Sequence, residues 1–239
     1  MKIESYLEST YLKTKEEVSL SEIDYNKIVV DLVNDAIAYS FRLVMIRANY
    51  IALANKMISK NNSRLLVGTV IDFPFGNKST AKKILEANFA IRHNVSDLDF
   101  VADYNSYKRG EYKKFDNDII EASRVCIKAG KNVKWIIETG ALSKDQIFSI
   151  SQRIYNIVNS NFIDNINKFF IKTSTGYYKN TGANVNDIRL IRSAANKIHI
   201  KASGGIKNRE DCIRMIEAGA TTIGTSSAIE ICKKRKNEF

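Results

Sequence analysis

The sequence is poor in cysteine and histidine. Its 239 residues contain three cysteines, Cys126, Cys212 and Cys232, and none of them belongs to a CxxC pair. An odd number without that spacing disfavours a disulfide framework and a structural zinc site, and it favours a reducing compartment. The histidines are His93 and His199, and the sequence contains no HExxH motif. We therefore expect no histidine-rich metal site.

Long apolar runs and flexible linkers are also absent. The longest apolar run is about five residues, whereas a membrane span needs about 20. The first residues, 1–13, lack the apolar core of a secretory signal. We therefore expect no membrane association and a cytoplasmic location. No Gly/Ser-rich or low-complexity stretch divides the chain, so we expect a single domain over residues 1–239.

The unusual feature of the composition is its positive charge. The chain has 37 lysines and arginines against 26 acidic residues, which is a net charge of +11. Such a surplus can indicate a nucleic-acid-binding surface, and the KKRK run at 233–236 fits that hypothesis. However, 25 lysines occur alongside 23 asparagines. This general enrichment favours a solvated, lysine-rich surface over a polynucleotide site.

Short apolar, β-branched runs alternate with helical patterns along the chain. Such runs are typical of strands buried on both faces of a parallel sheet. Ser21 and Ser143 are expected to cap two of the helices, and Gly219 is expected to end another. Eight strand–helix units in this length predict a TIM (β/α)8 barrel of the α/β class, because no GxGxxG motif supports an open doubly wound sheet. The seven clear runs are 42–46, 65–71, 97–103, 133–140, 169–176, 197–205 and 221–227, and a weaker eighth is 3–9.

Two lysines close neighbouring strands of this expected barrel. Lys172 ends the run FFIK and Lys201 ends IHIK, 29 residues later. Lysine is rarely buried without a partner, and two ammonium groups side by side lower the pKa of one of them. A neutral amine is a nucleophile that can form a Schiff base with a carbonyl. The alternative is a structural role in which each lysine pairs with a carboxylate.

Acidic residues and small-residue turns occupy other strand ends. Alternation places Asp97, Asp99 and Asp103 on one face of their strand, and an inward aspartate beside two lysines could hold an ammonium group and relay protons. Alternation alone leaves open which aspartate does so, or whether they lie on a solvated edge. The turns KASGGI and GTSSAI end the last two strands, where TIM barrels often bind phosphate.

At KTSTG (172–176) and KASGG (201–205) the chain resembles the deoxyribose-phosphate aldolase family of class I aldolases, which have a TIM-barrel fold. The resemblance extends over roughly residues 5–232. It includes VGTVIDFPFG (67–76), DLDFV (97–101), IIETG (136–140) and EAGATTIGTSS (217–227). The family cleaves 2-deoxy-D-ribose 5-phosphate reversibly to D-glyceraldehyde 3-phosphate and acetaldehyde. The resemblance implies an enzyme without a cofactor or metal that takes a sugar phosphate as its small-molecule partner, in deoxyribonucleotide catabolism.

The resemblance also implies a role for each matching residue. Lys172 would be the Schiff-base nucleophile, Lys201 would lower its pKa and join in proton transfer, and Asp99 would donate and accept protons. Glu8 and Thr173 are accessory candidates. The substrate phosphate would lie against the small residues of three turns, namely Gly176, Gly204, Gly205, Ser226 and Ser227.

The chain departs from the family pattern at several positions. Glu8 is one methylene longer than the usual aspartate, Asp72 adds a charge to the xFPxG turn, and the loop 177–184 is less glycine-rich. The C-terminal tyrosine that some members use is missing. These differences keep open the same lysine chemistry on a related phosphorylated aldehyde or sugar phosphate. A non-catalytic basic barrel that binds nucleic acid is the less favoured alternative, and a homo-oligomer is left open.

Overall fold

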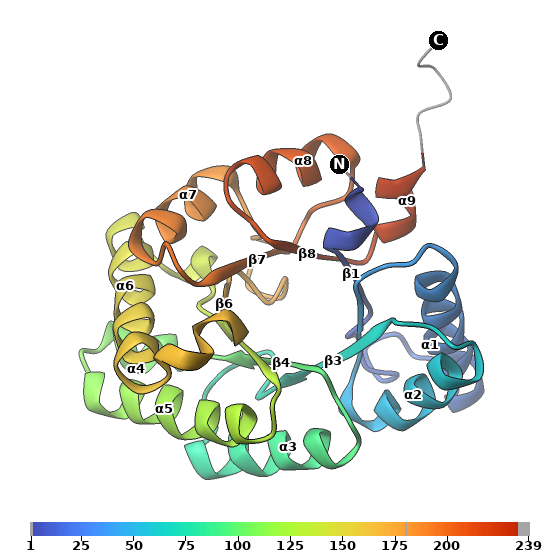
Figure 1. The fold of residues 1–239 in the computed structure, drawn as a ribbon, viewed down its shortest axis with the longest axis horizontal. Helices are drawn as coiled ribbons and strands as arrows, with labels where there is room; N and C mark the ends of the chain where they lie inside the picture. The colour runs from blue at the N-terminus through green and yellow to red at the C-terminus, as the bar shows by residue number, and fades with distance from the viewer. Residues whose placement is uncertain (1, 180, 234–239) are drawn as a thin grey trace.

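Eight parallel strands close into a barrel in the order of the sequence (Figure 1). The computed structural model describes residues 2–179 and 181–233. Each strand pairs with the next, and β8 pairs with β1, so the predicted TIM barrel is confirmed and all seven clear runs form strands. The strands are β1 (Leu7–Thr10), β2 (Leu43–Met45), β3 (Leu66–Ile71), β4 (Asp97–Val101), β5 (Asn132–Ile136), β6 (Phe169–Lys172), β7 (His199–Ser203) and β8 (Thr222–Thr225).

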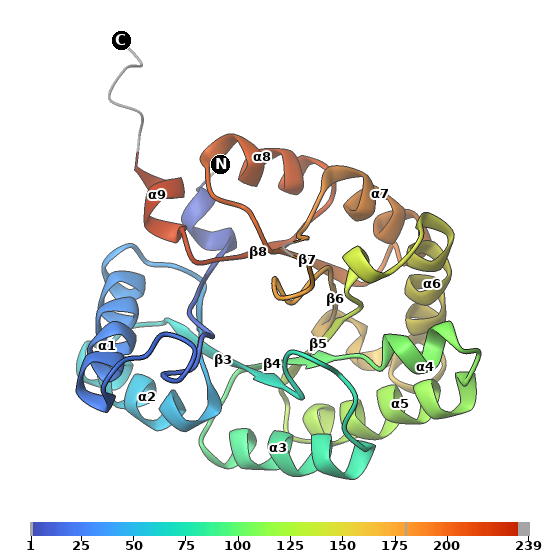
Figure 2. The ribbon, with the colours of Figure 1, turned by 180° about the vertical axis from the view of Figure 1, so that it is seen from behind.

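Helices form a ring around the strands, as both ribbon views show (Figures 1 and 2). The α-helices are α1 (Glu22–Ala38), α2 (Ile51–Lys60), α3 (Thr80–Arg92), α4 (Tyr104–Lys108), α5 (Tyr112–Lys128), α6 (Lys144–Asn161), α7 (Val185–Ala194), α8 (Arg209–Glu217) and α9 (Ala228–Cys232). Short 3-10 helices are η1 (Ile3–Tyr6), η2 (Ala48–Tyr50), η3 (Thr139–Ala141) and η4 (Ile163–Lys168). In the described part of the chain, no helix is long and apolar enough to cross a membrane.

The predicted helix ends are confirmed. Ser21 accepts a hydrogen bond from the Asp24 N–H at the start of α1, and Ser143 forms a capping box with Gln146 at the start of α6. Side-chain oxygens at these positions satisfy N–H groups that have no partner within the helix. Gly219 follows α8 with a φ of 117°, in the region that favours glycine.

The prediction of a strand over residues 3–9 was correct only for its second part. Residues Ile3–Tyr6 form η1, and β1 begins at Leu7. The physical reason is the barrel register: Leu7 is the first residue with a partner across β8, at Ile223, whereas Ile3 packs among the apolar side chains outside the strands.

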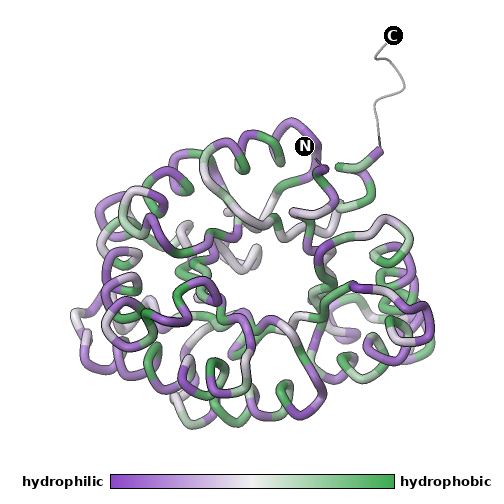
Figure 3. The backbone as a smooth tube through the Cα atoms, viewed as in Figure 1, coloured by the Kyte–Doolittle hydropathy of each residue, from purple (hydrophilic) through white to green (hydrophobic). Residues whose placement is uncertain are grey.

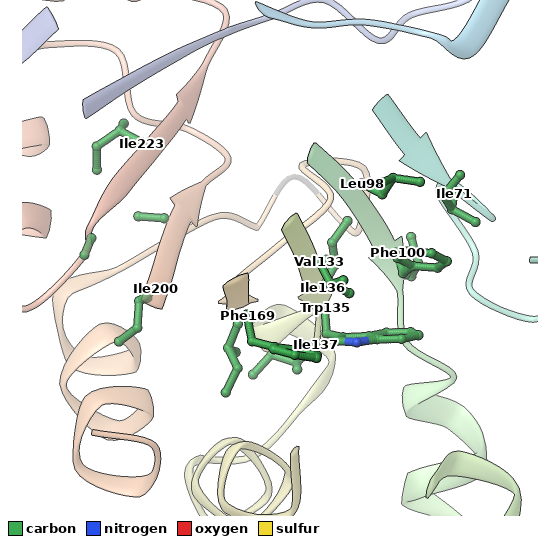
Figure 4. Packing of buried hydrophobic residues seen from close by; sticks show 14 of the residues in the cluster. Ile71, Leu98, Phe100, Val133, Trp135, Ile136, Ile137, Phe169, Ile200 and Ile223 are labelled. Carbon is green, nitrogen blue, oxygen red and sulfur yellow. The ribbon is translucent and has the colours of Figure 1, made fainter. Parts of the chain in front are cut away.

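Two different environments lie on the two sides of the strands. Outward side chains such as Phe100, Trp135 and Phe169 fill the space between strands and helices (Figure 4), and the hydrophobic positions of the helices face the strands (Figure 3). Trp135 stacks on Phe100 with ring centroids 4.9 Å apart. Inside the barrel, the side of β1–β3 holds an apolar cluster made of Leu12, Leu43, Met45 and Val70. The remaining interior carries charged side chains, and these form the site.

Candidate active site

The two predicted lysines meet at one carboxylate. Lys172 and Lys201 are register partners on β6 and β7, so their side chains enter the barrel at the same level. Their Nζ atoms donate to the same Asp99 Oδ2, at 2.9 Å and 2.7 Å. Asp99 is fully buried and Lys172 is 3% exposed. The structure therefore brings together the three residues that the sequence singled out for chemistry.

A third lysine and an arginine extend this group, and the sequence analysis missed both. Lys134, the register partner of Asp99, lies on β5 and places its Nζ 3.2 Å from Asp99 Oδ1 and 2.7 Å from Asp97 Oδ2. Arg42 precedes β2 and donates to Glu8 at 2.6 Å and to Asp97 at 2.9 Å. The available signal was a single charged residue at an inward position of an apolar run, the same signal that marked Lys172.

Glu8 reaches the centre of the barrel. Its carboxylate contacts Lys201, lies 3.3 Å from Lys134 Nζ and accepts a hydrogen bond from Arg42. The longer side chain of glutamate therefore still pairs with the lysines. Asp97 also accepts a hydrogen bond from Asn132 at 2.8 Å.

Asp103 does not share the face of Asp97 and Asp99. The strand β4 ends at Val101, so the alternation stops two residues before Asp103. Asp103 instead caps α4, where it accepts from the Ser106 N–H at 2.9 Å, and it pairs with Lys114 at 2.9 Å. The strand end thus leaves only Asp97 and Asp99 inside the barrel.

Burial and neighbouring charges push the pKa values of this group in opposite directions. Burial has the largest effect on Lys172, and together with the positive charges of Lys201 and Lys134 it outweighs the opposing effect of Asp99 and lowers the pKa of Lys172 to about 8. Burial alone would raise the pKa of Asp99, but the surrounding lysines outweigh it and hold that pKa below the usual range. Lys134 has the opposite shift from Lys172: burial opposes its charge, yet the carboxylates around it raise its pKa. Lys172 is thus set apart as a lysine with an accessible neutral form.

A cavity of about 750 Å³ opens above this group at the carboxyl ends of the strands. Lys172 and Lys201 line it, while Asp99 and Glu8 lie beneath the lining. It is also lined by four of the five residues expected to hold phosphate: Gly176, Gly204, Gly205 and Ser226. Ser227 is not part of the lining, and its N–H donates to Thr225 Oγ1 at 2.9 Å.

Thr173 is a structural residue in this arrangement. Its hydroxyl donates to the Ser203 carbonyl at 3.2 Å and accepts from the Ser203 N–H at 3.1 Å. These bonds tie β6 to β7 beside the two lysines. Thr173 is fully buried and does not line the cavity.

Two glycines shape the surroundings of the lysines. Gly204 has a φ of 90°, and an added Cβ would lie 2.9 Å from the Gly182 Cα, so this turn packs directly on the loop between β6 and α7. At Gly224, an added Cβ would lie 2.8 Å from Lys201 Cε. The missing side chain on β8 therefore makes room for the end of Lys201.

The positions that depart from the family pattern have defined surroundings. Asp72 is buried outside the cavity lining, where it accepts from the Lys78 N–H at 2.9 Å. Tyr177 lines the cavity, and its ring packs edge-on against Phe73 with centroids 5.1 Å apart. Of the KKRK run at 233–236, only Lys233 falls within the described residues, and the C-terminal residues 234–239 fall outside them.

The fold and this site define a class, a TIM-barrel enzyme with paired lysines at the floor of its pocket. The chain is 34% identical over 239 residues to a deoxyribose-phosphate aldolase from Mycoplasmopsis pulmonis, covering 99% of this chain and 98% of the relative. It is 33% identical to a deoxyribose-phosphate aldolase from Thermococcus gammatolerans, with the same coverage. The solved structure of QR15, an aldolase, superposes with a TM-score of 0.79 at 31% identity, covering 96% of this chain and 93% of that one. No family model matches the chain.

The chain belongs to the deoxyribose-phosphate aldolase family. This membership rests on relatives above 30% identity that match it over nearly its full length. The resemblance inferred from the KTSTG and KASGG motifs is thereby confirmed.

Proposed function

We propose that the protein is a Schiff-base aldolase that reversibly cleaves 2-deoxy-D-ribose 5-phosphate to D-glyceraldehyde 3-phosphate and acetaldehyde, in deoxyribose phosphate catabolism. The observation that carries this proposal is the pair Lys172 and Lys201, which share Asp99 at the floor of the cavity. The names of the relatives support the choice of substrate. The chemistry requires no metal or cofactor.

Lys172 is the nucleophile in this proposal. Its neutral amine attacks the aldehyde carbon of the open-chain sugar and forms a carbinolamine, which loses water to give an iminium ion. The iminium accepts the electron pair of the breaking carbon–carbon bond, and D-glyceraldehyde 3-phosphate leaves. The remaining enamine is protonated on carbon, and hydrolysis of the new iminium releases acetaldehyde and restores the amine.

Lys201 and Asp99 move the protons of these steps. Lys201 Nζ lines the cavity and donates to Asp99 Oδ2, so it lies between the substrate space and the buried carboxylate. With a bound water, this pair can take the proton of the sugar hydroxyl and return one to the enamine carbon. Glu8 holds Lys201 from the opposite side and is a positioning residue in this arrangement.

The anionic end of the substrate is assigned to the turns after β6, β7 and β8. Gly176, Gly204, Gly205 and Ser226 line that side of the cavity and offer small side chains next to backbone N–H groups. With Lys172 in its neutral form, the charged residues of the lining are Lys13, Lys201, Lys207 and Glu17, which is 3 − 1 = +2. A positive pocket favours a phosphate ester over a neutral sugar.

Reductive trapping tests the proposal directly. Borohydride added with deoxyribose 5-phosphate should reduce the iminium and leave a covalent adduct, which peptide mapping should locate on Lys172. A Lys172→Ala variant should form no adduct and should lose nearly all aldol cleavage. Full activity in that variant, or an adduct confined to another lysine, would contradict the assignment.

A related phosphorylated aldehyde or sugar phosphate is the second candidate substrate. Tyr177 and Glu17 both line the cavity, with Tyr177 Oη 3.5 Å from a Glu17 carboxylate oxygen, and they are among the residues that limit the space for a substrate. Turnover of deoxyribose 5-phosphate measured beside that of other sugar phosphates distinguishes the two. A cytoplasmic location, a single domain over 1–239 and a possible homo-oligomer remain predictions from the sequence.

A further inference from the structure

The charged layer inside the barrel holds one more cation than it holds carboxylates. Four basic side chains face three acidic ones, so the formal balance is 4 − 3 = +1. Because a buried charge without a partner is costly, such a layer favours the loss of one proton. The seven groups are Arg42, Lys134, Lys172 and Lys201 with Glu8, Asp97 and Asp99.

The contacts show which cation is least well paired. Lys134 lies within 3.3 Å of all three carboxylates. Lys201 contacts both Glu8 and Asp99. Lys172 contacts Asp99 alone, and it shares the same Oδ2 atom with Lys201. The surplus charge therefore falls on Lys172.

Arg42 supplies the extra cation from the far side of the layer. It lies at the amino-terminal end of β2, opposite the cavity, and its side chain is 19% exposed. Its guanidinium binds Glu8 at 2.6 Å and Asp97 at 2.9 Å and lies 5.8 Å from the centre of the Phe170 ring. Unlike a lysine, an arginine does not lose its proton in proteins, so this charge is permanent.

We propose that Arg42 is a positioning residue: by occupying Glu8 and Asp97, it leaves Lys172 as the cation in surplus and so keeps the Lys172 amine in its neutral, nucleophilic form. This inference rests on the proposed role of Lys172 and adds to it the group that determines its protonation. Arg42 touches neither the cavity nor the reacting atoms, and it acts through the lysines.

The contacts also indicate how the layer would respond to the loss of Arg42. Among the groups of the layer, Glu8 and Asp97 would then have only lysines as charged partners. Lys201 would be held more tightly by Glu8 and less by Asp99. Asp99 would be left to Lys172, whose ammonium form would gain a carboxylate of its own.

Two other titratable groups face this layer, and neither forms an ion pair with it within the described residues. Glu138, in the turn after β5, accepts from the Thr175 N–H at 3.1 Å, and burial raises the pKa of its carboxyl group. His199 stacks on Phe170 with ring centroids 4.8 Å apart. Burial, followed by the charges of Arg192 and Arg42, lowers the pKa of His199. The charge of Lys172 opposes the shift of Glu138 but forms no direct ion pair with it among the described residues, so the seven groups of the layer are those that direct ion pairs connect.

Two variants, each of which removes one charge from the layer, should shift the pKa of Lys172 in opposite directions. Arg42→Met removes one cation and should raise the pKa of Lys172 by about one unit. Asp97→Asn removes one carboxylate and makes Lys134 compete for Asp99. This variant should therefore lower the pKa of Lys172. The double variant restores the charge balance to 3 − 2 = +1. It should return the pKa of Lys172 toward the wild-type value of about 8. A role in folding alone would not reverse its sign in this way.

The pKa of Lys172 is measured from the pH dependence of its labelling by an amine-selective reagent, quantified by peptide mapping. This readout needs no turnover, and the pH dependence of kcat/KM is recorded beside it. Arg192→Met is the matched control, because Arg192 is a partly buried arginine that donates to the carbonyls of Asn196, Ile198 and Gly219 outside the layer. It should leave the labelling curve of Lys172 unchanged.

The outcomes separate this inference from the proposed function. If substrate and borohydride mark Lys172 but Arg42→Met does not shift its labelling curve upward, the role of Arg42 is wrong and the aldolase assignment stands. If no adduct forms on Lys172 in the wild type, the proposed function itself fails. If Arg42→Met does not fold, Asp97→Asn alone decides, because an unchanged or raised pKa of Lys172 in that variant overturns the inference.

Discussion

At the scale of single residues, the chemistry depends on where each lysine finds its carboxylate. Lys172 and Lys201 could be predicted because each ends an apolar run, at a spacing of one strand–helix unit. Lys134 and Arg42 were not predicted, because one charged residue in a lysine-rich chain is weak evidence until the strands are placed side by side. The strand register, in which Lys134 is the partner of Asp99, supplies that information.

Gly224 offers a sharp test at this scale. An alanine there would push against Lys201 Cε, which is the flexible end of a side chain, so the fold can adapt. The displaced ammonium no longer meets Asp99 as before, and a shift of about 1 Å can cost up to about 100-fold in rate. We expect Gly224→Ala to lower kcat/KM by about 10- to 100-fold with little change in melting temperature, as measured by steady-state assay and thermal denaturation.

Gly68→Ala is the control for this substitution. Its Cβ would meet Met45 Cε, also the end of a flexible side chain, but in the apolar part of the barrel interior. It should change kcat/KM far less than Gly224→Ala. Equal activities of the two variants would show that the position of Lys201 is not critical.

At the scale of elements, the sequence predicted the strands better than what surrounds them. Apolar runs located the barrel strands because a buried strand requires them, and the helix caps followed from local side-chain chemistry. The pairings of side chains from distant elements could not be read in this way. Asp72, for example, lies 3.6 Å from the Nζ of Lys83, a buried lysine of α3 that also donates to the carbonyl of Val101 at 3.0 Å and pairs with Asp118 of α5.

Removal of Lys83 should therefore destabilise the fold. Lys83 is fully buried, and its ion pair with Asp118 links α3 to α5. Breaking a buried pair leaves an uncompensated charge and typically costs about 3–5 kcal/mol. We expect Lys83→Met to lower the free energy of unfolding by that amount in urea titrations. The double variant Lys83→Met with Asp118→Asn should lose less, although Asp72, which lies 3.6 Å from Lys83 Nζ, keeps its charge. An equal or greater loss would argue against the ion pair with Asp118 as the cause.

At the scale of the whole molecule, the net charge of +11 has two parts. A few of the cations form the charged layer and the cavity lining, where an anionic substrate gives them a reason. Apart from buried residues such as Lys83, the others belong to a surface that the sequence pattern describes as solvated. The nucleic-acid hypothesis leaves Lys172, Lys201 and Asp99 unexplained, whereas the aldolase hypothesis uses all three.

The buried carboxylates should make the stability of the molecule sensitive to acid. Burial raises the pKa of Asp97, but Lys134, Arg42 and the hydrogen bond from Asn132 outweigh it and lower that pKa from 3.8 to about 2. Since the folded state binds this proton more weakly than the unfolded state, the contribution to stability is complete above about pH 4 and is lost as the pH falls toward 2. For Asp97 alone this is about 2 kcal/mol. Urea titrations between pH 7 and pH 2.5 should show this loss, and Asp97→Asn should reduce it; a stability independent of pH below 4 would contradict it.

The register of the strands also affects how the protein can evolve. Lys134, Lys172 and Lys201 lie on three successive strands around one carboxylate, so the barrel carries more than one amine within reach of its reaction centre. Besides Lys172, Lys201 also faces the cavity. A barrel built in this way can lose its principal amine by mutation and still retain a second one from which activity can be selected again. The redundancy that stabilises the buried carboxylate is thus also a source of evolvability.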